Sequence, residues 1–102
     1  MRHWLLRYTL APDYLDRRGT YRAEHLALAW AAADRGALLL GGAAGDPPGE
    51  ALLLFAGDDA GEAEAFARAD PYVANGLVTG WTILPWAAVV GEGAATPVRP
   101  GS

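Results

Sequence analysis

The sequence contains no cysteine and no lysine, and its one serine is Ser102. The absence of cysteine excludes disulfide bonds and thiolate chemistry. Because no GxSxG motif occurs, the sequence also excludes the serine nucleophile of a hydrolase. All 8 cationic residues are arginines, they form no basic run, and the net charge is −4. A surface that follows the phosphates of a nucleic acid needs such a run, so no nucleic-acid partner is expected.

Long apolar runs, metal-ligand motifs and phosphate loops are missing as well. No apolar run approaches the roughly 20 residues that cross a bilayer, and the first residues, MRHWLLRYTLAPDY, lack the pattern of a signal peptide. We therefore expect a soluble, cytoplasmic protein with no membrane partner. His3 and His25 have neither HxH nor HExxH spacing, which predicts no metal site. GxGxxG and GxxxxGKS/T do not occur, and no cofactor is expected.

Apolar residues, by contrast, are abundant, at 52% of the 102 residues. This length corresponds to one domain. A domain of this size buries only part of its surface, so the apolar excess predicts a second buried face formed by self-association, as a homodimer or a higher oligomer. The alternative is a dense monomeric core with alanine on the surface.

The hydrophobic pattern predicts the order strand, helix, strand, strand, helix, strand. The segments are residues 3–10, 19–35, 37–42, 50–58, 60–69 and 79–89. Alternation over residues 3–10 places Trp4, Leu6 and Tyr8 on the core face and Leu5 and Arg7 on the other. Two helices can cover one face of a four-stranded sheet, so dimerisation through the opposite face would explain the apolar excess. Residues 90–102, rich in Gly and Pro, are expected to form a flexible tail after a domain of residues 1–89.

The long helix expected over residues 19–35 carries the first candidate for chemistry. Thr20 is a plausible N-cap, and Gly36 suits a left-handed stop. An apolar stripe at helical spacing is expected to be buried: Leu26, Ala29, Trp30 and Ala33. Arg22 lies one turn before this stripe and His25 borders it. His25 is either an inert, hydrogen-bonded residue beside the core or a general acid–base, a role for which histidine is suited near neutral pH.

Asp70 is the second candidate. It follows the helix expected at residues 60–69 and precedes Pro71, which is favoured at the first helical position. Asp70 can therefore cap a short turn, and a capping carboxylate beside His25 would also fix the tautomer and orientation of the imidazole. Several aromatic residues are either core or the lining of a pocket for a flat organic ligand. They are Trp4, Tyr8, Trp30, Tyr72, Trp81 and Trp86.

The order and spacing of these segments resemble the YCII-related family. The resemblance covers about residues 3–89 and rests on the aromatic first strand, RAEHL, EAEAFARADPY and GWTILPW. It implies a ferredoxin-like α+β fold of the dimeric α+β barrel type, similar to muconolactone isomerase. It also implies that His25 and Asp70 form the active-site pair. One branch of the family resembles dehydrochlorinases that act on chlorinated hydroxyhydroquinones, which implies elimination assisted by an acid–base pair.

Two functions follow as expectations. The first is a small, cofactor-independent enzyme that uses His25 and Asp70 for isomerisation or elimination of HX on a cyclic or aromatic oxygenated compound. Arg7 or Arg22 would bind a substrate oxyanion, and Tyr72 and Trp81 would line the pocket. The second is a non-catalytic module of the same fold for small-molecule binding or assembly.

Overall fold

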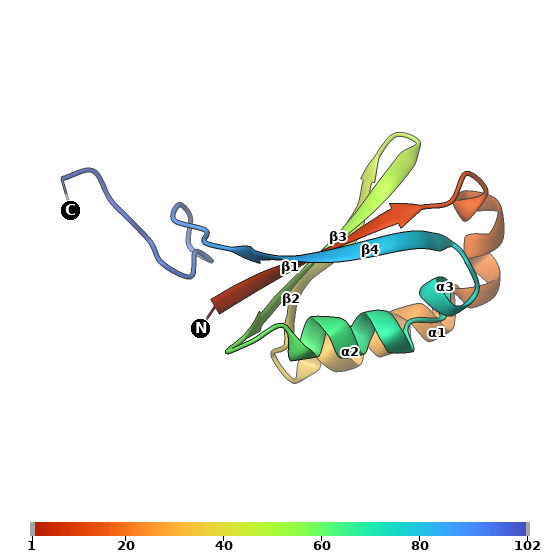
Figure 1. The fold of residues 1–102 in the computed structure, drawn as a ribbon, viewed down its shortest axis with the longest axis horizontal. Coiled ribbons are helices and arrows are strands. Elements are labelled where there is room, and N and C mark those ends of the chain that lie inside the picture. Colours follow the sequence, from red (N-terminus) through yellow and green to blue (C-terminus); the bar gives the residue numbers. More distant parts are fainter. Residues whose placement is uncertain (1, 102) are drawn as a thin grey trace.

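A computed structural model describes residues 2–101 and shows a four-stranded antiparallel sheet with its helices on one face (Figure 1). The elements are β1 (Arg2–Leu10), α1 (Tyr14–Asp34), β2 (Leu38–Gly45), β3 (Pro48–Gly57), α2 (Gly61–Ala69), α3 (Pro71–Ala74) and β4 (Val78–Trp86). The spatial order of the strands is β2-β3-β1-β4. The predicted ferredoxin-like βαββαβ fold is therefore confirmed, with the short helix α3 added after α2.

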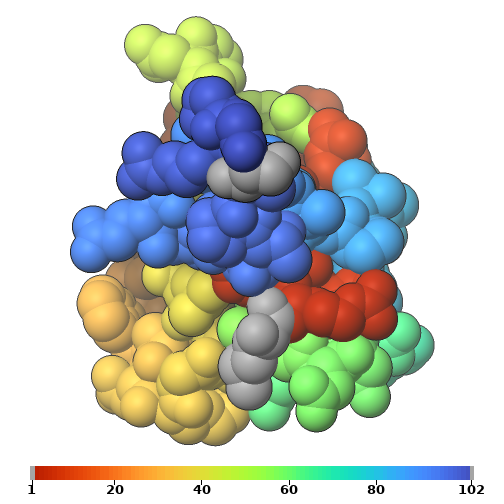
Figure 2. Space-filling view, turned by 90° about the vertical axis from the view of Figure 1, so that its left-hand side faces the viewer, coloured from red at the N-terminus to blue at the C-terminus, as the bar shows by residue number. Residues whose placement is uncertain are grey.

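Strand β1 lies inside the sheet and supplies the centre of the core. Leu6 is paired with Leu53 of β3 and Ile83 of β4, and all three face the helices. Tyr8, two residues further, also faces the helices and is almost fully buried. This register confirms the alternation expected for residues 3–10. In Figure 2, α1 (orange to yellow) and α2 (green) lie side by side beneath the strands.

Helix α1 begins at Tyr14, five residues before the predicted start, so the expectation that Thr20 is its N-cap is wrong. Asp13 occupies the N-cap position instead. Tyr14 is buried and packs edge-on against Tyr72, with ring centroids 5.8 Å apart. This tertiary contact favours the early start, since an aromatic anchor in the first turn buries surface that a loop would expose. The helix ends as predicted, and Gly36 has φ +83°.

The apolar stripe predicted to be buried on α1 is largely open. Trp30 is 66% exposed and Leu26 is 38% exposed, whereas Ala32 is buried. The reason is the position of α1, which lies beneath β2 at the edge of the sheet rather than beneath its centre (Figure 1). The stripe therefore faces a partly open space and not a closed core.

The remaining expectations about secondary structure are mostly confirmed. Strands β2 and β3 extend beyond the predicted segments 37–42 and 50–58, so only a short turn at Asp46 and Pro47 separates them. Strand β4 is an edge strand, a position that tolerates Pro85. Within residues 2–101, no helix is both long and apolar enough to cross a membrane.

The face of the sheet opposite the helices carries apolar side chains. By register, Leu5 of β1 lies between Leu54 of β3 and Leu84 of β4, and Leu52 lies in the next row. Leu52 and Leu84 are exposed. Arg7 and Glu50 form an ion pair on the same face. No helix of the described chain covers this surface.

Candidate functional site

Asp70 joins α2 to α3 and is the most buried charged residue of the described chain, at 0% exposure. Its backbone is extended, with ψ 122°, and its side chain caps α3 by accepting a 3.0 Å hydrogen bond from the Tyr72 backbone N–H. Pro71 occupies the first helical position, as the sequence predicts. The other carboxylate oxygen accepts a 2.9 Å hydrogen bond from the Tyr8 hydroxyl. Local helix capping thus explains why a carboxylate sits at this depth.

His25 completes the set of hydrogen bonds around Asp70. Its Nδ1 lies 2.9 Å from Asp70 Oδ1. The imidazole is stacked on the Tyr72 ring, with centroids 3.9 Å apart and planes 7° apart, and it makes a T-shaped contact with the Phe66 ring. A carboxylate has only acceptor oxygens, so it accepts this hydrogen bond as it accepts those from Tyr8 and Tyr72. The proton therefore lies on Nδ1 of His25. The arrangement leaves Nε2 as the ring nitrogen able to exchange a proton with a ligand.

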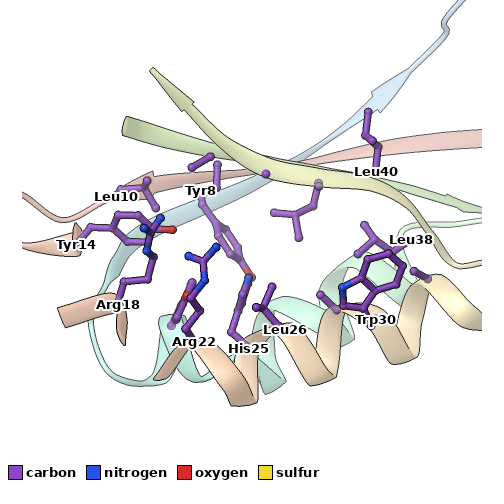
Figure 3. Close-up of a pocket in the computed structure, with 18 of the residues that line it drawn as sticks. Tyr8, Leu10, Tyr14, Arg18, Arg22, His25, Leu26, Trp30, Leu38 and Leu40 are labelled. Atoms are coloured by element: carbon purple, nitrogen blue, oxygen red, sulfur yellow. The ribbon is translucent and has the colours of Figure 1, made fainter. Parts of the chain in front are cut away.

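A cavity of about 350 Å³ lies between α1 and the sheet, and His25, with a side chain 16% exposed, is part of its wall (Figure 3). Asp70 is behind His25 and is not part of the wall. One end of the cavity carries Tyr14, Arg18 and Arg22, and the other carries apolar residues. Figure 3 shows these two groups on opposite sides of His25.

The cavity exists because the facing positions of helix and sheet are occupied by small residues. Ala29 and Ala33 line it from α1, and Gly41, Ala43 and Ala51 line it from β2 and β3. A Cβ atom added at Gly41 would lie 3.4 Å from Leu53, so the absent side chain leaves room in the wall. The volume falls at the low end of the roughly 300–1,000 Å³ typical of small-molecule sites.

Two tyrosines of the site, Tyr8 and Tyr72, have raised pKa values. Burial raises the pKa of Tyr8, and the negative charge and hydrogen bond of Asp70 act in the same direction. Burial likewise raises the pKa of Tyr72, while the guanidinium groups of Arg22 and Arg18 oppose that effect. Tyr8 therefore acts as a donor to the Asp70 carboxylate, which tyrosinate would repel.

The residues predicted for the site divide into two groups. His25 and Asp70 are in contact, and Arg22 and Tyr72 line the same cavity. Arg7 and Trp81, also predicted to bind the substrate, do not line this cavity. Arg7 points to the opposite face of the sheet, where it pairs with Glu50.

Trp81 of β4 is paired with Tyr8 of β1, yet its side chain does not line the cavity. It packs against the core, with the guanidinium of Arg68 over its ring. Its proximity to Asp70 in sequence does not bring it to the cavity, because β4 lies on the side of β1 opposite to β3 and β2.

Sequence reasoning missed Arg18, Tyr14 and the link between Tyr8 and Asp70. The signal for the first two was present, since Tyr14, Arg18 and Arg22 follow each other at intervals of four residues and so share one face of a helix. A predicted helix start at residue 19 left Tyr14 and Arg18 outside the helix. The link between Tyr8 and Asp70 spans 62 positions, and no local pattern encodes it.

The donor set does not resemble a metal centre. Within residues 2–101, no group of three or more His, Cys, Asp or Glu side chains is placed to hold a metal ion. The arrangement is suited to proton transfer. The buried carboxylate of Asp70 holds Nδ1 of His25, and Nε2 of the same ring is left for a ligand in the cavity.

Three solved structures share the fold. A 5-chloro-2-hydroxyhydroquinone dehydrochlorinase from Burkholderia phenoliruptrix, in complex with 2,5-dihydroxybenzoquinone, is 20% identical, with a TM-score of 0.69 over 84% of this chain and 94% of that one. A candidate antibiotic biosynthesis monooxygenase from Deinococcus radiodurans is 23% identical, with a TM-score of 0.52 over 90% and 94%. A protein from Agrobacterium tumefaciens is 16% identical, with a TM-score of 0.50 over 93% and 98%.

The family assignment rests on sequence. None of the curated proteins matches the chain. The profile of the YCII-related domain matches residues 1–87, which agrees with the resemblance seen in the sequence over residues 3–89. The chain belongs to the YCII-related domain family.

Proposed function

We propose that the protein is a small, cofactor-independent enzyme that moves protons on a cyclic or aromatic oxygenated compound, in an isomerisation or an elimination of HX. The observation that carries this proposal is the contact between His25 Nδ1 and Asp70 Oδ1, 2.9 Å, at the wall of a cavity of about 350 Å³. A buried carboxylate that accepts three hydrogen bonds is a rigid support for an imidazole.

In this mechanism Nε2 of His25 removes a proton from a carbon or an oxygen of the substrate. In an elimination, the electrons of the broken C–H bond form a C=C bond, and X leaves as the anion. In an isomerisation, the imidazolium returns its proton to a different atom of the substrate. Asp70 stabilises the imidazolium and keeps the ring in position, and Tyr72 supports it from its stacked face. General acid–base catalysis of this kind contributes about 10²–10⁴-fold in rate.

The dehydrochlorinase that shares the fold supports the reaction class, because the substrate in its name and its bound quinone are single-ring oxygenated compounds. The dimensions of the cavity also suit a single ring. Arg22 is the candidate for binding an oxyanion of the substrate, since its side chain lies on the cavity wall beside His25 (Figure 3).

The enzyme is proposed to act as a homodimer joined through the open face of the sheet. Leu5, Leu52 and Leu84 form an apolar centre on this face. The neighbouring pair Arg7 and Glu50 makes the surface self-complementary in charge when two copies meet about a two-fold axis.

The test is turnover on two ring compounds. Chloride release from 5-chloro-2-hydroxyhydroquinone measures elimination. Deuterium uptake from D₂O at a ring carbon of 2,5-dihydroxybenzoquinone measures proton transfer. We expect the wild type to accelerate at least one of them, and His25→Gln to lose about 10²–10⁴-fold of that rate.

His3→Gln is the matched control, because His3 lies on the other face of the sheet and does not line the cavity. A rate that is equal in His25→Gln and the wild type contradicts the proposal. That result would favour a non-catalytic ligand-binding module.

A further inference from the structure

We propose that the cavity is a polarised site, in which Arg18, Arg22 and the Tyr72 hydroxyl bind an acidic oxygen of the ligand and the Trp30 end binds an apolar substituent. This inference rests on the proposed function in that both concern the same cavity. It names the substrate class: a single-ring organic anion that carries a hydrocarbon group on the side of the ring away from its acidic oxygen.

Two arginines at one end of the cavity are the first support. Arg18 and Arg22 are one helical turn apart on α1 and both line the wall. The ion pairs among residues 2–101 involve other cations: Arg7, Arg17, His25 and Arg35. The Arg18 guanidinium instead lies over the Tyr14 ring, 5.5 Å from its centroid. Two positive charges without a carboxylate partner in the described chain make this end of the cavity complementary to an anion.

The Tyr72 hydroxyl is the second and independent support. Tyr72 is 3% exposed and lines the cavity, yet its hydroxyl is buried with no hydrogen-bond partner within residues 2–101. Leaving such a group unpaired costs about 1–3 kcal/mol. Arg18, Arg22 and Tyr72 line the same cavity, so the phenol and the two cations share one neighbourhood. An oxyanion placed there would accept from all three donors.

The opposite end of the cavity has the reverse character. Leu26, Trp30 and Leu38 line it, and Trp30 is 66% exposed although it is the largest apolar side chain of α1. Figure 3 shows the Trp30 indole beside Leu38, on the side of His25 away from Arg18. A hydrocarbon group that covers this surface would gain about 25 cal/mol per Å² of apolar area removed from water.

The spacing along α1 sets the size of the ligand. Arg22 and Trp30 are eight residues apart, which at 1.5 Å per residue separates their backbones by roughly 12 Å. One six-membered ring with a short alkyl group spans that distance. His25 lies between the two ends, so the ring itself would rest against the imidazole, where the proposed proton transfer takes place.

Binding of matched benzoic acid derivatives by calorimetry tests the proposal. The probes are 4-propylbenzoate, benzoate and the neutral isostere 4-propylbenzamide. We expect wild type to bind 4-propylbenzoate about tenfold or more tighter than 4-propylbenzamide, since hydrogen bonds to a charged group are the stronger ones. The propyl group should also strengthen binding by about tenfold or more relative to benzoate.

Three variants locate the two ends of the site. Arg18→Gln combined with Arg22→Gln should abolish the preference for the anion and leave the propyl effect. Trp30→Ala should reduce the propyl effect and leave the preference for the anion. Arg99→Gln removes one arginine from the C-terminal segment outside the cavity, and as a control it should behave as wild type.

Two results overturn the inference: no binding of 4-propylbenzoate by wild type, or anion preference unchanged in the double variant.

The outcome of this binding test is separable from the outcome of the test of the proposed function. His25→Gln should still bind 4-propylbenzoate while its proton transfer is lost. Anion preference without any proton transfer supports the polarised site alone, and proton transfer without anion preference supports the enzyme and overturns this inference.

Discussion

The hydroxyl of Tyr8 donates a 2.9 Å hydrogen bond to Oδ2 of Asp70, across 62 positions of sequence. Tyr8 belongs to a central strand and Asp70 to the junction of two helices, and both are almost fully buried. The bond therefore joins the sheet to the helical layer at the carboxylate that also contacts His25. The stability of the fold and the orientation of the candidate base depend on the same group.

Tyr8→Phe removes this bond and leaves an Asp70 oxygen buried without its donor. We expect the free energy of unfolding to fall by about 1.5–3 kcal/mol, the range for a hydrogen bond to a charged group. Urea denaturation at neutral pH measures it. Tyr21→Phe is the control, at a half-buried tyrosine of α1 that is outside the Asp70 hydrogen bonds. Equal losses in the two variants would contradict the special role of Tyr8.

The raised pKa values of Tyr8 and Tyr72 predict an alkaline loss of stability. Their contribution is fully present below the ordinary tyrosine value of 10.0 and is lost as the pH rises toward the higher folded-state pKa, because the unfolded chain releases its protons first. Urea denaturation over a series of pH values measures this dependence. The alkaline loss should be shallower in Tyr8→Phe than in wild type, and parallel curves would refute the assignment.

Filling the cavity should block the ligand without unfolding the protein. Ala29→Leu places a larger side chain against the wall, whereas Ala27→Leu makes the same change at an exposed position of α1 outside the cavity. We expect calorimetry to show that Ala29→Leu weakens binding of 4-propylbenzoate about tenfold or more, since the larger side chain occupies the space that the ligand needs. Ala27→Leu should bind as wild type. Equal affinity in the two variants would place the ligand elsewhere.

The proposed dimer predicts a variant that separates the subunits. Leu84→Glu puts a charge into the open face of the sheet, where an interface would leave it buried and unpaired. Light scattering after size exclusion should give a dimer mass for wild type and a monomer mass for Leu84→Glu. Leu15→Glu, at an exposed leucine of α1, should remain a dimer. A monomeric wild type would contradict the proposal.

The fold was predictable because its signals are local. The alternation of Leu6 and Tyr8 with Leu5 and Arg7, and the pairing of Asp70 with Pro71, are each read within a few residues. The start of α1 was not predictable in this way, because the contact between Tyr14 and Tyr72 that favours it is tertiary.

The site was predictable only in part for a related reason. His25 and Asp70 could be named from their residue types and from the resemblance to the family. Trp30 and Leu26 follow a helical apolar pattern that does not distinguish a closed core from the wall of a cavity. The distinction comes from the small residues across the gap, Gly41 and Ala51, which belong to other elements.

The most direct test of the account is the protonation pattern of the His25 ring, measured by ¹⁵N NMR at a pH where the imidazole is neutral. His3 is the internal reference, as the only other histidine. The account predicts that Nδ1 carries the proton toward Asp70 and that Nε2 is unprotonated in the cavity, with this preference lost in Asp70→Ala. A proton on Nε2 in wild type, with Nδ1 bare, would contradict it, because the basic nitrogen would then face Asp70 and not the ligand.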